Sequence, residues 1–166
     1  MKIYGVTGWK NTGKTTLMER LVAEFVARGL KVSTVKHAHH DTDIDHEGRD
    51  SYRHRVAGAT EVVLSSPRRW AVMHELRDSP EPPLAELLGK LSPVDLVLVE
   101  GYKRAPHPKV EAYRLAAGRD LLARSNDTIR AVASDTAIDD ISLRVIDLND
   151  TTAIADFILR DLGMQV

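Results

Sequence analysis

The chain has 166 residues, of which 43% are hydrophobic and 28% are charged. This composition is typical of a globular protein and excludes a disordered, collagen-like or coiled-coil chain, and the length predicts a single domain, residues 1–166. The net charge of −1, from 23 Lys and Arg against 24 Asp and Glu, predicts neither a nucleic-acid nor a membrane partner.

The first elements of the chain form a βαβ pattern. Residues 3–7 are a short apolar run that predicts a strand, and Gly8 ends it. From Lys14 onward apolar residues recur at spacings of three, four and seven, which predicts a helix that ends at Gly29. Residues 32–35 form a second β-branched run. We therefore expect two parallel strands joined by a right-handed helical crossover.

The middle of the chain departs from this pattern. Residues 37–48 have no apolar period, and we predict an exposed loop. A short helix is predicted over residues 50–57. Residues 61–64 and 70–74 flank a polar turn and predict an inserted β-hairpin.

The remaining residues return to alternating helices and strands. Leucines at helical spacing after residue 83 predict a helix, and residues 96–99, the most apolar run, predict a central strand. Residues 109–113 follow a proline-containing basic loop and predict an edge strand. Further strands are predicted over residues 129–133 and 145–148, followed by a helix over residues 151–162. The absence of cysteine and of any ~20-residue apolar segment is consistent with a cytoplasmic protein.

One motif carries the chemistry. Residues 8–15 match G-x-x-x-x-G-K-[ST] between the first predicted strand and the first helix, which is the context that a phosphate-binding P-loop needs. Its backbone N–H groups and the helix N-terminus would face phosphate oxygens. Lys14 would reach the β- and γ-phosphates, and the Thr15 hydroxyl would bind Mg²⁺. The fold class predicted is therefore the α/β, three-layer P-loop NTPase fold: a mostly parallel, doubly wound sheet with an inserted β-hairpin.

A P-loop also needs a carboxylate near its metal, and the central strand offers two. Asp95 stands at the beginning of this strand and Glu100 at its end. Ligands of a parallel sheet lie beyond the carboxyl ends of its strands, so Glu100 is predicted to support the metal. Trp9 in the P-loop has two open interpretations: it covers the nucleotide or a partner, or it packs on its neighbours.

The polar loop is rich in histidine and acid. It contains or adjoins His37, His39, His40, His46 and His54, together with Asp41, Asp43, Asp45, Glu47 and Asp50. Imidazole and carboxylate groups together suit a transition metal such as zinc or nickel, although their spacing matches no closed structural site. As the segment after the second strand, the loop also occupies the place of a switch segment, in which Asp45 is the favoured catalytic acid beside Glu100. Several cations are candidates for a second anionic substrate: Arg49, Arg53, Arg55, Arg68, Arg69, Lys103, Arg104 and Lys109.

Three blocks together resemble one family. These are the P-loop, residues 35–41 with residues 45–53, and residues 99–103 (Val-Glu-Gly-Tyr-Lys), and in combination they are similar to the molybdopterin-guanine dinucleotide biosynthesis protein B (MobB) family. The likeness runs from residue 1 to about residue 109.

The resemblance implies a GTP- and Mg²⁺-binding adapter with weak GTPase activity. It also implies a homodimer that assists the guanylyltransferase joining GMP to molybdopterin, and contact with other molybdopterin-pathway proteins. The family's phosphate-binding residues map onto Gly8, Trp9, Lys10, Asn11, Thr12, Gly13, Lys14, Thr15 and Thr16, and its acidic strand-end position maps onto Glu100.

The sequence lacks the Asn-Lys-x-Asp motif that reads guanine in many GTPases, so the guanine preference comes from the resemblance. Ser134 and Asp135, which follow a predicted strand, are the candidates for reading the base.

Two other functions fit the residues. A P-loop kinase of small molecules would suit the size and the scattered arginines, and would turn over nucleotide quickly only with an acceptor. A metal-delivery protein would use the histidine-rich loop, and would bind nickel or zinc tightly.

Overall fold

The computed structural model describes residues 1–38 and 45–165. The chain forms two compact units, of which the first comprises Met1–His37 with Leu84–Val166 and the second comprises Ala38–Pro83. Whether they make one domain stays a prediction. None of the described helices is long and apolar enough to cross a membrane.

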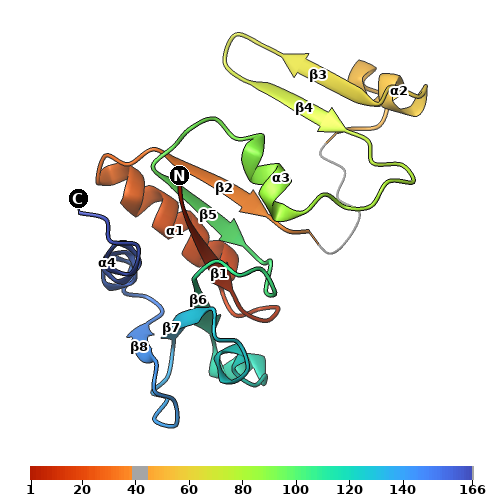
Figure 1. The fold of residues 1–166 in the computed structure, drawn as a ribbon. Coiled ribbons are helices and arrows are strands. Elements are labelled where there is room, and N and C mark those ends of the chain that lie inside the picture. The colour runs from red at the N-terminus through yellow and green to blue at the C-terminus, as the bar shows by residue number, and fades with distance from the viewer. Residues whose placement is uncertain (39–44, 166) are drawn as a thin grey trace. The chain divides into compact units, whose positions relative to one another are not determined.

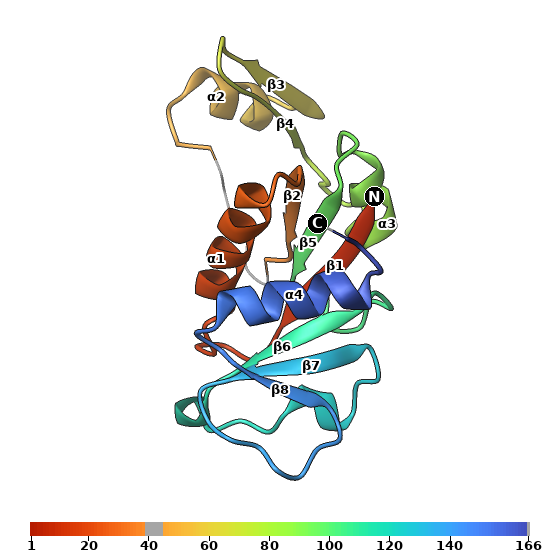
Figure 2. The ribbon, with the colours of Figure 1, turned by 90° about the vertical axis from the view of Figure 1, so that its left-hand side faces the viewer.

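The first unit is an α/β structure around a six-stranded parallel sheet with the order β2-β5-β1-β6-β7-β8 (Figures 1 and 2). Its strands are β1 (Lys2–Thr7), β2 (Val32–Lys36), β5 (Leu96–Glu100), β6 (Lys109–Tyr113), β7 (Ile129–Ser134) and β8 (Arg144–Asp147). Its helices are α1 (Lys14–Ala27), α3 (Leu84–Gly89), α4 (Thr151–Asp161) and the 3-10 turns η1 (Leu115–Ala117) and η2 (Leu122–Arg124). The predicted parallel α/β sheet is confirmed.

Helices α1 and α4 pack side by side on one face of this sheet (Figure 2). The stripe of Leu17, Leu21 and Phe25 on α1 is fully buried, and it belongs to the same apolar core as Ile158 of α4. Burial of each such side chain contributes ~1.5–3 kcal/mol. The apolar period in the sequence therefore corresponds to the face of α1 that anchors the P-loop end of this helix.

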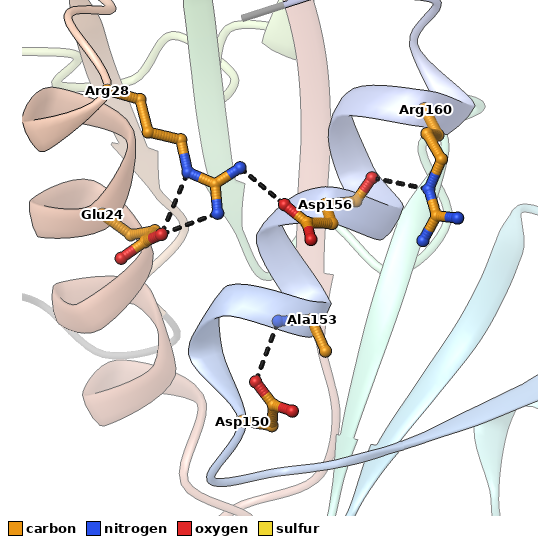
Figure 3. Close-up of polar contacts among 6 residues, drawn as sticks. All are labelled: Glu24, Arg28, Asp150, Ala153, Asp156 and Arg160. Carbon is orange, nitrogen blue, oxygen red and sulfur yellow. Dashed lines mark hydrogen bonds and ion pairs between the residues drawn. The ribbon is translucent and has the colours of Figure 1, made fainter.

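Polar contacts add to this helix pair (Figure 3). Arg28, which follows α1, donates to Glu24 of the same helix and to Asp156 of α4, at 2.7 Å and 2.6 Å. The Asp150 carboxylate accepts a hydrogen bond from Ala153 N at 2.9 Å and so caps α4. Arg160 Nε donates to the Asp156 carbonyl at 3.1 Å.

Strand β6 corrects one prediction, because it lies inside the sheet between β1 and β7 rather than at an edge. The proline-containing loop before it suggested an edge, but Lys109 and Glu111 of the strand are fully buried. The Lys109 ammonium donates to the carbonyls of Ala105 and His107 and to Thr128, and burial lowers its pKa to about 8. The Glu111 carboxylate accepts from two backbone N–H groups that begin η2. Each charge can be buried because polar groups of neighbouring loops form hydrogen bonds with it in place of water.

The second unit contains the helix α2 (Asp50–Val56) and an antiparallel pair of strands, β3 (Glu61–Ser65) and β4 (Trp70–His74). The predicted hairpin is confirmed. Val62 points to the buried side, whereas its neighbour Val63 is 64% exposed. Alternation along the strands places Val63 on the opposite face from Val62, and this Val63 face is called the open face; on the other face Val62 is covered, whereas Leu64 is 56% exposed.

Candidate functional site

The P-loop joins the carboxyl end of β1 to the N-terminus of α1, as its sequence context predicts. Two of its residues must be glycine. A Cβ at Gly8, whose φ is +142°, would lie 2.4 Å from the Ala112 carbonyl oxygen of β6. Gly13, with φ +87°, would bring a Cβ to 3.2 Å from Arg114 Nε. The loop is therefore fitted closely against the neighbouring strand, with its backbone facing the end of the sheet.

Lys14 lies along this loop. Its ammonium donates to the Trp9 carbonyl at 2.5 Å, and the Thr12 hydroxyl donates to the same oxygen at 2.9 Å. Burial lowers the pKa of Lys14, Glu100 opposes that shift, and the positive charges of Lys103 and Lys36 add to it. A lysine held among other cations is arranged to meet several negative charges, such as those of a polyphosphate.

Thr15 and Glu100 meet at the end of β5. The Thr15 hydroxyl donates to Glu100 Oε1 at 3.2 Å, and Lys36 Nζ of β2 lies 3.6 Å from Glu100 Oε2. Glu100 is only 8% exposed, so its carboxylate is held in place by these groups. A hydroxyl and a carboxylate are oxygen ligands of the kind that suits Mg²⁺. Asp95, by contrast, lies at the opposite end of β5, where its carboxylate accepts from Lys31 N at 2.7 Å.

Trp9 packs on its neighbours. Its indole N–H donates to the Asp120 carbonyl at 2.8 Å. Lys103 Nζ lies 4.0 Å from the ring centroid and Arg119 Cζ lies 5.9 Å from it. The indole therefore connects the P-loop to the segments that follow β5 and β6. The other residues of the motif vary in exposure: Lys10, Asn11 and Thr16 are exposed, whereas Thr12 is buried.

Arg114 is a site residue that the sequence reasoning missed. It follows β6, lies against Gly13, and pairs through Nη1 with Asp135 Oδ2 of the segment after β7 at 3.7 Å. Its position directly after a strand was a usable signal. The sequence analysis did not connect Arg114 with the P-loop, because it predicts residues 109–113 as an edge strand.

Asp45 lies in the second unit, where it is held by its neighbours. Its carboxylate accepts from the Ser51 hydroxyl at 2.9 Å and pairs with Arg55 at 3.4 Å, and its side chain is 8% exposed. The prediction of an exposed loop is therefore wrong at this position, because Ser51 and Arg55 of α2 cover the carboxylate. Its catalytic role stays a prediction.

The histidine-rich segment is described only in part. His39, His40, Asp41 and Asp43 lie outside the described residues. His37 stacks on Tyr102, with ring centroids 4.6 Å apart. Within residues 1–38 and 45–165, no three His, Asp or Glu side chains come together as ligands for a metal ion.

Two of the candidate cations for a second anionic substrate are engaged inside the protein. Arg55 pairs with Asp45 and with Glu75, and the Lys109 ammonium bonds the backbone of its own loop. Lys103, over the ring of Trp9, remains near the P-loop.

A protein-family model matches residues 3–135 of the chain, and its description is "MobB: Molybdopterin guanine dinucleotide synthesis protein B". The match includes the P-loop, Glu100 and Asp135.

Curated relatives and solved structures agree with this match. The molybdopterin-guanine dinucleotide biosynthesis adapter protein of Escherichia coli is 39% identical over 161 residues, which cover 95% of this chain and 91% of that protein. The adapter protein of Haemophilus influenzae is 38% identical over 159 residues, which cover 94% of this chain and 86% of that protein. A crystal structure of Bacillus subtilis MobB is 27% identical and aligns with a TM-score of 0.75 over 98% of both chains. The crystal structure of the MobB homolog from Bacillus stearothermophilus is 29% identical and aligns with a TM-score of 0.73, over 98% of this chain and 99% of that one.

Proposed function

The chain belongs to the family of molybdopterin guanine dinucleotide synthesis protein B, and on that premise we propose that it is a cytoplasmic GTP-binding adapter with weak, Mg²⁺-dependent GTPase activity. Its role is that of an adapter in molybdopterin-guanine dinucleotide biosynthesis. Its partners would be the guanylyltransferase of that pathway and other molybdopterin-pathway proteins.

The observation that carries the proposal is the cluster of Lys14, Thr15 and Glu100 around the P-loop, in which Gly8 and Gly13 leave no room for a Cβ. Backbone N–H groups and Lys14 would hold the phosphates, while Thr15 and Glu100 would hold Mg²⁺ directly or through water. The ion would neutralise charge on the phosphates. The residues present therefore fit a magnesium nucleotide.

We expect slow hydrolysis by the isolated protein. The only glutamine in the sequence is Gln165, beyond the last helix. Arg114 is paired with Asp135 on the β6 side of the P-loop, whereas Glu100 lies on the β5 side. A well-placed arginine contributes ~10³–10⁵ in rate to GTP hydrolysis. Without such a group, turnover should stay far below that of typical enzymes.

A titration tests both parts of the proposal. GTP and ATP are titrated into the protein with Mg²⁺, alone and with the guanylyltransferase, and phosphate release is followed. We expect GTP to bind, and the partner to change turnover. A rate above about 10 s⁻¹ without any partner would contradict the weak activity. Fast turnover that needs an added metabolite as phosphate acceptor would instead indicate a kinase.

We also propose that the protein is a homodimer that uses the open face of the hairpin. Val63, Trp70 and Val72 share this face and are 64%, 68% and 45% exposed. Among the described residues β3 and β4 pair only with each other, and an isolated two-stranded sheet is marginally stable. A second copy of the hairpin would cover the apolar face of the first with matching chemistry.

Trp70→Glu should therefore convert a dimer into a monomer, since it places a charge in the apolar contact. Sedimentation equilibrium at micromolar concentration measures the change. Leu115→Glu, at a residue that is also exposed but lies in η1, is the matched control and should leave the mass unchanged. A wild-type monomer, or a Trp70→Glu dimer as tight as wild type, would refute this surface.

A further inference from the structure

Lys103 lies beside the P-loop, and among residues 1–38 and 45–165 no carboxylate forms an ion pair with it. Its Nζ instead lies 4.0 Å from the ring centroid of Trp9. The face of the ring attracts a cation only weakly at a partly exposed site, because the ring carries no net charge. Arg55 pairs with two carboxylates and Lys109 is buried in its own loop, whereas the charge of Lys103 can still meet an anion.

The loop of residues 101–108 fixes the backbone of Lys103. The Lys103 carbonyl accepts from Asn126 Nδ2 at 2.8 Å, which ties this position to the segment before β7. The preceding Tyr102 stacks on His37, with ring centroids 4.6 Å apart. The base of the Lys103 side chain is therefore held on both sides, while its flexible four-carbon stem can still move the ammonium.

One residue of the P-loop contacts both Lys103 and Lys14. The Trp9 carbonyl accepts from Lys14 Nζ at 2.5 Å, and the Trp9 ring lies next to Lys103 Nζ. Burial lowers the pKa of Lys14, Glu100 opposes that shift, and the charge of Lys103 adds to it. Two ammonium groups that converge on one loop repel each other, and a polyphosphate between them would bind both.

The place of Lys103 in the chain indicates which phosphate it meets. It stands three residues after Glu100, on the loop that leaves the carboxyl end of β5. At this end the Thr15 hydroxyl donates to Glu100 at 3.2 Å, and these two groups would hold Mg²⁺. The ion bridges the β- and γ-phosphates of a bound nucleotide. A cation on this loop therefore approaches the γ-phosphate end of the nucleotide.

We propose that Lys103 binds the γ-phosphate, so that the site prefers a nucleoside triphosphate to a diphosphate, and that Trp9 positions Lys103 for this contact. Lys103 thus serves the nucleotide rather than a second anionic substrate. An interaction made equally with bound GTP and with the transition state tightens binding without raising kcat, which agrees with the slow hydrolysis expected above. This inference rests on the proposed GTP binding and names a residue that gives its specificity.

Lys103→Met tests the assignment, because it removes the charge and keeps a long side chain. We expect the affinity for GTP to fall about 10- to 100-fold, the effect of losing a hydrogen bond to a charged group. GDP lacks the γ-phosphate, and its affinity should change by less than about threefold at about 0.15 M salt, where distant charges are screened. Calorimetry with GTP and GDP in the presence of Mg²⁺ measures both affinities, and retained GDP binding shows that the fold is kept.

Trp9→Leu tests the positioning role. Loss of the indole N–H removes the bond to the Asp120 carbonyl, which should affect GTP and GDP alike. Loss of the ring should in addition lower the ratio of GTP affinity to GDP affinity. In the double variant Trp9→Leu, Lys103→Met this ratio should be no lower than in Lys103→Met alone. Additive losses in the ratio would show that Trp9 does not act through Lys103.

The controls separate the two levels of the proposal. Arg104→Met removes the same charge from the next residue of the loop, which is exposed, and should retain the wild-type ratio. An equal fall of the ratio in Arg104→Met and Lys103→Met would mean that only the net charge matters, and would refute the contact. A wild-type protein that binds neither GTP nor GDP refutes the proposed function. Wild-type binding of GTP with an unchanged ratio in Lys103→Met refutes the role of Lys103 alone.

Discussion

Lys14→Ala is expected to weaken GTP binding at least about 100-fold while leaving the fold intact. A hydrogen bond to a charged group is worth ~1.5–3 kcal/mol, and the ammonium would give at least two to the phosphates. In the structure Lys14 bonds only the Trp9 carbonyl of its own loop among the contacts described for it. Its removal should therefore leave the core of α1 and the sheet unchanged.

Calorimetry with GTP and Mg²⁺ measures the affinity, and thermal unfolding checks the fold. Lys90→Ala is the matched control, since this exposed lysine follows α3 and should not affect binding. Equal affinity of Lys14→Ala and wild type would mean that nucleotide does not bind at the P-loop.

Glu100→Gln is expected to weaken Mg²⁺-dependent GTP binding or hydrolysis by about 10- to 100-fold. This is the usual effect of removing a group that supports a metal ligand. The expectation comes from the 3.2 Å hydrogen bond between Thr15 and Glu100 and from the burial of this carboxylate. The amide keeps the size of the side chain but removes its charge.

Asp95→Asn is the control on the same strand. The two acids are five residues apart, which is ~16 Å at ~3.3 Å per residue, so they cannot share one metal. Asp95 accepts from Lys31 N, and its replacement should cost about 0.5–1.5 kcal/mol of stability without changing the Mg²⁺ titration. The opposite pattern in the two magnesium titrations would exclude Glu100 as the supporting acid.

The region from β1 to α1 could be predicted from the sequence because two independent patterns coincide there. The spacing of Gly8, Gly13 and Lys14 defines the loop, and the apolar period after Lys14 defines the helix. The position of Glu100 followed from a rule about parallel sheets, and the parallel pairing of β1 with β5 confirms the premise of that rule.

Strand β6 could not be placed in the same way, because its two buried charges depend in part on hydrogen-bond partners that are distant in the sequence. Glu111 depends on Leu122 and Ala123, and Lys109 on Thr128. Nothing in the sequence shows that residues 122–128 lie beside this strand, and the proline-containing loop before it favoured an edge. The same error concealed Arg114, since a residue after an edge strand has no reason to reach the P-loop.

The strand order has a consequence for the synthesis of this protein. Both neighbours of β1 come late in the chain, since β5 begins at Leu96 and β6 at Lys109. At ~5–20 residues per second, a ribosome needs about 5 s or more to reach β6 after it has made β1. Throughout that interval the P-loop has no strand to close against, and the apolar face of α1 has no complete sheet to cover. The nucleotide can therefore bind to a complete P-loop site only after about two thirds of the chain has been translated.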